Sequence, residues 1–101
     1  MYILAMKPSD ALAAHRAELR QLAGRHGLQH PRVFGSVVSG KDDEESDLDL
    51  LVDPTETTSL FTLARFKRDA ETLLGIPVSV LTPGGLPLKF RNQVLLQAQP
   101  L

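Results

Sequence analysis

Residues 35–53 read GSVVSGKDDEESDLDLLVD, and this stretch decides which folds are possible. Its first seven residues satisfy the G-x-x-x-x-G-K pattern of the phosphate-binding P-loop. A P-loop continues with Ser or Thr, whose hydroxyl reaches Mg²⁺, but here the next residue is Asp42. The P-loop lysine also opens a helix, whereas Lys41 is followed by a polar run with no apolar period. The stretch is therefore not a P-loop, and its glycines would belong to a different kind of phosphate site.

The acidic end of the stretch gives that alternative. Asp47 and Asp49 are two residues apart, so on a strand their side chains point to one face. The core would then take Leu48, Leu50 and Val52 on the other face. Two neighbouring carboxylates are unfavourable unless a cation lies between them. Mg²⁺ suits this pair, because it binds few carboxylates and completes its shell with water and substrate phosphates.

The glycine end adds the phosphate contacts. Gly35 permits close approach of the backbone, and Ser36 offers a hydroxyl and an amide N–H to a phosphate. An Asp-x-Asp pair alone is more often a solvated strand edge. The joint pattern of strand, Gly-Ser, ten-residue spacer and Asp-x-Asp instead favours a phosphate-and-metal site.

The rest of the chain predicts a small α/β (α+β) fold, with a mixed sheet of three to four strands flanked by helices. The expected strands are 32–36, 47–53 and 77–82, and the expected helices are 9–25, 57–74 and 88–98. Strand, crossover helix and strand over 47–82 form a βαβ-like unit. We expect a loop over 37–46 and a turn over 83–85.

Apolar spacing predicts which side chains each helix buries. On the first helix these are Leu12, Leu19, Leu22 and Ala23, with a cap at Ser9 or Asp10. The second helix would bury Leu60, Leu63, Ala64, Ala70, Leu73 and Leu74, and the last Phe90, Val94 and Leu95.

Composition narrows the function classes. The chain has 101 residues, expected to form one domain over 1–101, with a formal net charge of −1 and no cysteine. These values exclude a disulfide framework and a thiolate metal site, and they give no support for direct nucleic-acid binding. The opening MYILAM is interrupted by Lys7 and Pro8, and no apolar run reaches the length of a membrane span. We expect a cytoplasmic protein.

Residues 33–40, VFGSVVSG, and 46–53, SDLDLLVD, resemble the signature of the minimal nucleotidyltransferases. These form the MNT-like branch of the DNA polymerase β-type nucleotidyltransferase superfamily. Residues 60–86 match that family's second half in layout, so the resemblance covers nearly the whole chain. It implies a polymerase-β-like core and a nucleotidyltransferase that takes Mg²⁺ and a nucleoside triphosphate, with ATP expected. It further implies an antitoxin that transfers AMP to a HEPN-domain ribonuclease toxin, or silences it by binding.

The resemblance also assigns roles to residues. Gly35 and Ser36 would bind the triphosphate, and Asp47 and Asp49 would be the catalytic metal ligands. Two positions depart from the family pattern: Ser39 stands where an arginine is usual, and Ser79 stands where the third strand carries a third aspartate. That carboxylate helps to hold a metal and can take a proton, and losing a general base typically costs about 10²–10⁴-fold in rate.

Two functions therefore remain open from the sequence. The first is an active adenylyltransferase. The alternative is a catalytically impaired antitoxin that neutralises its partner by binding, which Ser79 favours. Nucleotidylation of a small molecule is a weaker alternative, since it would need an acceptor pocket, and a homodimer is possible.

Other polar residues predict no site of their own. We interpret His15, His26 and His30 as surface residues and Asp53 as a strand-end residue. The acidic side chains of residues 42–45 are expected to be solvated, as are Arg65, Lys67 and Arg68 on the second helix.

Overall fold

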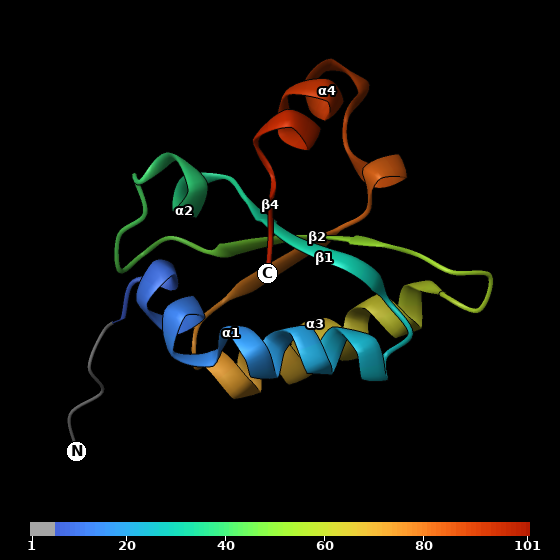
Figure 1. The fold of residues 1–101 in the computed structure, drawn as a ribbon, viewed down its shortest axis with the longest axis horizontal. Helices are drawn as coiled ribbons and strands as arrows, with labels where there is room; N and C mark the ends of the chain where they lie inside the picture. The colour runs from blue at the N-terminus through green and yellow to red at the C-terminus, as the bar shows by residue number, and fades with distance from the viewer. Residues whose placement is uncertain (1–5) are drawn as a thin grey trace.

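The computed structural model describes residues 6–101, which form a mixed four-stranded sheet with helices on both faces (Figure 1). The elements in chain order are α1 (Pro8–Arg25), β1 (Gln29–Phe34), α2 (Ser36–Ser39), β2 (Leu48–Asp53), α3 (Leu60–Leu74), β3 (Val78–Leu81), the 3-10 turn η1 (Pro83–Gly85), α4 (Leu88–Gln97) and β4 (Gln99–Pro100). None of the helices in this part of the chain is long and apolar enough to cross a membrane.

The strand order is β3-β2-β1-β4. Strand β1 pairs antiparallel with β2 and with β4, whereas β2 and β3 are parallel. Helix α3 makes the crossover between the two parallel strands, which confirms the βαβ unit expected over 47–82. The observed sheet confirms the predicted fold class, and its fourth strand is the short β4.

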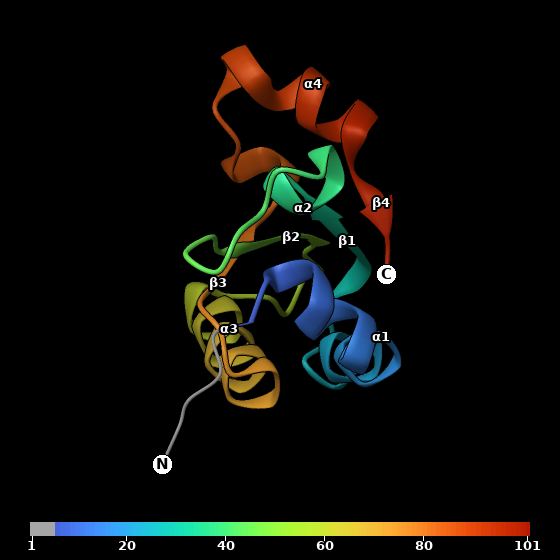
Figure 2. The same ribbon diagram turned by 90° about the vertical axis from the view of Figure 1, so that its left-hand side faces the viewer.

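The core lies mainly on one side of the sheet. Leu48, Leu50 and Val52 of β2 are fully buried there against α1 and α3, as the alternation predicted. Leu51 faces the opposite side, where it forms a smaller cluster with Phe34 and Leu86 beneath α4. Figure 2 shows the two helical sides above and below the sheet. Strand β2 is therefore buried on both faces at its centre.

Helix α3, expected over 57–74, begins at Leu60 and ends at Leu74. Ser59 forms a capping box with Thr62, and Gly75 ends the helix in the left-handed conformation. The predicted stripe is wrong at its N-terminal end, since Leu60 is 83% exposed and Ala64 is also exposed. The buried line instead runs through Phe66, and at 3.6 residues per turn Leu60 lies about 120° around the helix from it.

Helix α1 begins at Pro8, so the predicted Ser9 or Asp10 cap is wrong; Lys7 is the N-cap residue and makes no side-chain cap. A kink at His15, with φ −132° and ψ 22°, divides the helix. The predicted buried positions are confirmed for Leu12, Leu19 and Ala23, while Leu22 is half-buried.

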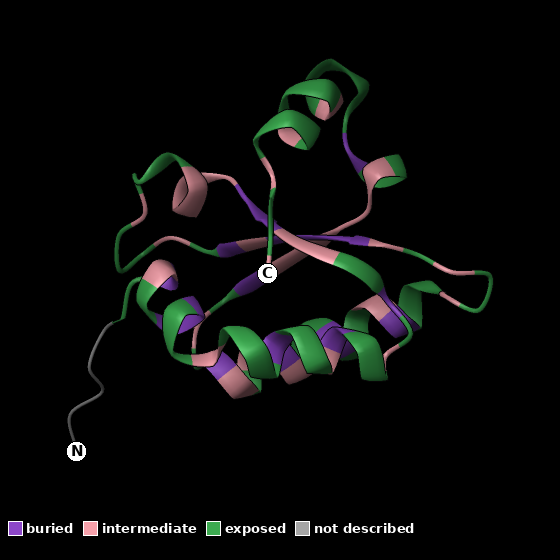
Figure 3. Cartoon of the chain, in the orientation of Figure 1, coloured by how far each residue is buried: buried purple, intermediate pink, exposed green. Residues whose placement is uncertain are grey.

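Three further expectations need correction. Residues 36–39 form the short helix α2 instead of a loop. Strand β1 starts at Gln29, because a bulge near His30, whose φ is +49°, extends its pairing with β2. On α4 only Val94 packs inward as predicted, because the apolar cluster beneath the helix is small. Figure 3 shows α4 mostly exposed, in contrast to the buried positions along α1 and α3. Phe90 and Leu95 are 49% and 41% exposed.

Candidate functional site

The strand register brings the predicted site residues to one end of the sheet. Asp49 lies opposite Ser79 on β3 and opposite Phe34 on β1. Gly35 follows Phe34 directly, so its backbone also lies next to Asp49. Asp47, the predicted first residue of that strand, lies just before β2, which begins at Leu48. The sequence-predicted positions therefore meet where three strands end or begin. Gly35 and Ser36 follow β1, Asp47 and Asp49 lie at the start of β2, and Ser79 lies near the start of β3.

Gly35 is required here for two reasons. Its φ of +75° lies in the region that side chains disfavour. A Cβ at this position would also collide with the Asp49 carboxylate, whose Cγ would be 3.1 Å away. Only glycine allows the turn from β1 into α2 to pass this close to Asp49.

Helix α2 turns the chain back toward β2 within a few residues. The N–H groups of Val38 and Ser39 donate to the Gly35 carbonyl, and the N–H of Lys41 donates to Ser36. Gly40 ends the helix in the left-handed conformation. The first turn of α2 therefore holds Ser36 half-buried beside the sheet end, where its hydroxyl can meet a ligand.

The two aspartates differ in their surroundings. Asp47 is exposed and Asp49 is half-buried. Burial raises the pKa of Asp49 above its ordinary value, and the negative charge of Asp47 raises it further. Among the ion pairs within residues 6–101, none involves either aspartate. A bound cation would therefore stabilise the charged form of Asp49.

The donor set fits Mg²⁺ with few protein ligands. No group of three or more His, Cys, Asp or Glu side chains in the described residues is arranged to hold a metal ion. Asp47 and Asp49 can supply two carboxylates, and Mg²⁺ usually fills its other positions with water and substrate phosphates. Ser79, half-buried beside Asp49, supplies no charge.

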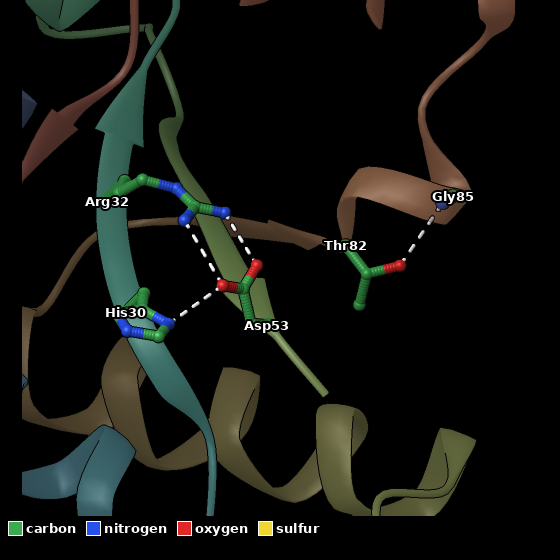
Figure 4. A network of polar contacts seen from close by, with 5 residues as sticks. All are labelled: His30, Arg32, Asp53, Thr82 and Gly85. Carbon is green, nitrogen blue, oxygen red and sulfur yellow. Dashed lines mark hydrogen bonds and ion pairs between the residues drawn. The ribbon is translucent and has the colours of Figure 1, made fainter. Parts of the chain in front are cut away.

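Asp53 cannot replace the missing carboxylate. It lies at the far end of β2, opposite Gln29, and is held by two side chains of β1 (Figure 4). Arg32 donates to both of its oxygens at 2.8 and 3.4 Å, and His30 Nδ1 lies 2.9 Å from Oδ2. The Arg32 hydrogen bonds lower the pKa of Asp53. Asp53 therefore joins two strands. The sequence predicted only a strand-end residue at this position.

Two further residues differ from their predicted surroundings. The Asp42 carboxylate, expected to be solvated, accepts the Ser9 backbone N–H at 2.9 Å. His26, expected at the surface, has a side chain only 16% exposed. It lies 2.9 Å from Asp69 and packs edge-on against Phe66. Neither contact has a local sequence signal, because each joins segments more than 30 residues apart.

Comparisons with known proteins show what the chain is similar to. The model of the family described as Polymerase beta, Nucleotidyltransferase matches residues 21–101. The protein adenylyltransferase MntA of Thermococcus cleftensis is 38% identical over 84 residues, 83% of this chain and 82% of that protein. A solved structure assigned to the minimal nucleotidyltransferases is 44% identical, with a TM-score of 0.83 over 92% of this chain and 95% of that one.

Two solved complexes share the fold at lower identity. One is a toxin–antitoxin pair with AMP-PNP, at 20% identity and a TM-score of 0.72 over 83% of this chain and 69% of that one. The other is a tri-AMPylated HEPN toxin of Shewanella oneidensis in complex with its MNT antitoxin, at 17% identity and a TM-score of 0.66. It covers 87% of this chain and 69% of that one. At this level of identity the likeness shows the fold alone.

Proposed function

Because the chain belongs to the polymerase beta nucleotidyltransferase family, we propose that it binds ATP with Mg²⁺ and transfers AMP to a protein partner. The observation that carries this proposal is Asp49, a half-buried carboxylate with no ion-pair partner in residues 6–101, set between the Gly35 backbone and Ser79. The partner we propose is a HEPN toxin, on the basis of the MntA relative and the complexes that share the fold. The proposed setting is the cytoplasm.

Each site residue has a role in this proposal. Asp47 and Asp49 hold Mg²⁺, which when bound stabilises charge on the attacking and leaving oxygens. The Ser36 N–H and hydroxyl bind phosphate oxygens, and Gly35 keeps the backbone clear of side-chain atoms at that point.

The transfer forms one bond and breaks one. A hydroxyl oxygen of the partner bonds to the α-phosphorus of ATP, and the bond from that phosphorus to the bridging oxygen breaks, so that diphosphate leaves. The hydroxyl proton needs an acceptor, and Ser79 is a weak one. Water takes the proton in this proposal, which predicts a slow reaction.

The second candidate function is binding without turnover. It is favoured by Ser79, which leaves the position beside Asp49 neutral, and by Asp53, which Arg32 and His30 already hold. In this case the protein keeps the nucleotide site and neutralises its partner by contact.

The test is the intact mass of a HEPN partner co-expressed with this chain and supplied with Mg-ATP. Wild type, Ser79→Asp and the double variant Asp47→Asn/Asp49→Asn are compared. A shift by AMP with wild type and none with the double variant supports the transferase. If only Ser79→Asp modifies the partner, the natural chain acts by binding, and if no variant does so, the transfer proposal is wrong.

A further inference from the structure

The hydrogen bond between Asp42 and Ser9 joins two segments that are 33 residues apart in sequence. Ser9 lies in the first turn of α1, where backbone N–H groups have no partner within the helix. The Asp42 carboxylate satisfies one of them from outside at 2.9 Å. That hydrogen bond lowers the pKa of Asp42.

The part of α1 before the kink at His15 is packed into the core. Pro8, Ala11 and Leu12 are buried in the core. The kink at His15 separates this part from the rest of the helix, and Figure 1 shows it beneath the loop that follows α2. A group bonded to Ser9 is therefore tied to the core of the molecule.

The loop held by Asp42 otherwise closes on itself. Asp43 Oδ1 accepts the N–H of Glu45 and the hydroxyl of Ser46, and the N–H of Asp43 donates to Ser46 Oγ. These bonds make residues 43–46 one compact turn. The turn is joined to the fold through Asp42 on one side and through Leu48, whose N–H donates to the Pro77 carbonyl, on the other.

The same loop connects the two halves of the proposed site. It runs from α2, which carries Ser36, to Asp47 at the start of β2. Asp47 is exposed, so the backbone on either side of it determines where its carboxylate lies. Resting on the proposed function, we propose that Asp42 is a positioning residue, which fixes residues 41–47 to α1 and so holds Asp47 beside Asp49 for the metal.

The test compares four single variants of the full chain and the double variant Asp42→Ala/Ser9→Pro. Asp42→Ala removes the acceptor, Ser9→Pro removes the donor in the first turn of α1, and Asp42→Asn keeps an acceptor oxygen without the charge. Glu44→Ala is the matched control, an exposed acidic residue of the same loop. Each is titrated with Mn²⁺ by electron paramagnetic resonance in the presence of AMP-PNP, and amide hydrogen exchange is followed over residues 41–48.

We expect Asp42→Ala and Ser9→Pro to weaken Mn²⁺ binding by about tenfold, as supporting residues of metal sites do. Both should speed exchange in residues 41–48, and their effects should not add in the double variant, because both remove one bond. Asp42→Asn should retain most of the affinity, and Glu44→Ala should match wild type.

The possible results distinguish failure of the positioning role from failure of the proposed function. If wild type binds Mn²⁺ and Asp42→Ala binds it equally well, the positioning role is wrong and the proposed function stands. If wild type binds no Mn²⁺, both are wrong. If Glu44→Ala weakens binding as much as Asp42→Ala, loop charge rather than the bond to Ser9 is responsible, which also contradicts the proposal.

Discussion

At the scale of single residues, the charged carboxylate of Asp49 lowers the stability of the metal-free folded protein. Its carboxylate is half-buried, and its neighbours are the like-charged Asp47, the Gly35 backbone and the neutral Ser79. A raised pKa means that the ionised form is less favourable in the folded protein than in the unfolded chain. A cost of this kind at one position is typical of a ligand site.

Asp49→Asn should therefore stabilise the metal-free protein. In EDTA at pH 7 we expect its Tm to rise by about 2 °C, a small effect because solvent screens a half-exposed charge. Differential scanning calorimetry measures this. Mn²⁺ should raise the Tm of wild type and leave that of Asp49→Asn unchanged. A lower Tm for Asp49→Asn in EDTA would show that the carboxylate makes a stabilising contact instead.

At the scale of elements, side-chain hydrogen bonds join β1 and β2 at the end opposite the site. Arg32 lies on β1 opposite Leu51, and its guanidinium reaches along the sheet to Asp53. His30 joins the same carboxylate from the bulge, where its positive φ is unfavourable for a residue with a side chain. The three side chains hold the irregular part of β1 against β2.

The hydrogen bonds to Asp53 predict a contribution to stability that is lost in acid. The pKa of Asp53 is lower in the folded state, chiefly through Arg32, so the contribution is present above the unfolded pKa of about 3.9. It is lost as the pH falls through the lowered folded value. Asp53→Asn should reduce the free energy of unfolding by about 1 kcal/mol at pH 7, and by progressively less at acidic pH.

Urea unfolding between pH 7 and pH 2 measures the difference between Asp53→Asn and wild type. Glu56→Gln, which changes an exposed carboxylate in the loop after β2, is the control and should show no such trend. A difference that stayed constant across this range would mean that the Arg32 ion pair contributes nothing through the charge of Asp53.

At the scale of the whole molecule, the two sides of the sheet are unequal. Helices α1 and α3 bury residues along their length, whereas α4 has no buried residue. It packs on a small cluster through Val94, joined by Ala98 just after its end. Leu88 and Leu96 of α4 are 80% and 87% exposed. Arg91 adds hydrogen bonds to the carbonyls of Gly84 and Leu86.

Helix α4 should therefore open at lower free energy than the rest of the fold, because it has few buried apolar contacts. In native-state hydrogen exchange we expect its amides to exchange at least about tenfold faster than those of β2. The amides of α3 provide the control, since they belong to a helix with a buried stripe. Equal protection of α4 and β2 would contradict this unequal division of stability.

The sequence by itself determined the local part of this protein. Strand alternation put Asp47 and Asp49 on the face of β2 opposite Leu48, Leu50 and Val52. Apolar spacing and capping signals predicted a helix over 57–74, where α3 forms. These features could be predicted because each depends on residues a few positions apart, whose relative directions the backbone period sets. The single-domain prediction over 1–101 stays a prediction.

Only the tertiary structure decided the contacts between distant segments. The bond from Asp42 to Ser9, the pairing of His26 with Asp69 and the hold of Arg32 on Asp53 have no local periodicity to mark them. Helix α4 exposes Phe90 and Leu95 because the apolar patch beneath it is small, which no pattern within the helix records. Periodicity states which face of an element is apolar, but packing decides how much of that face finds a partner.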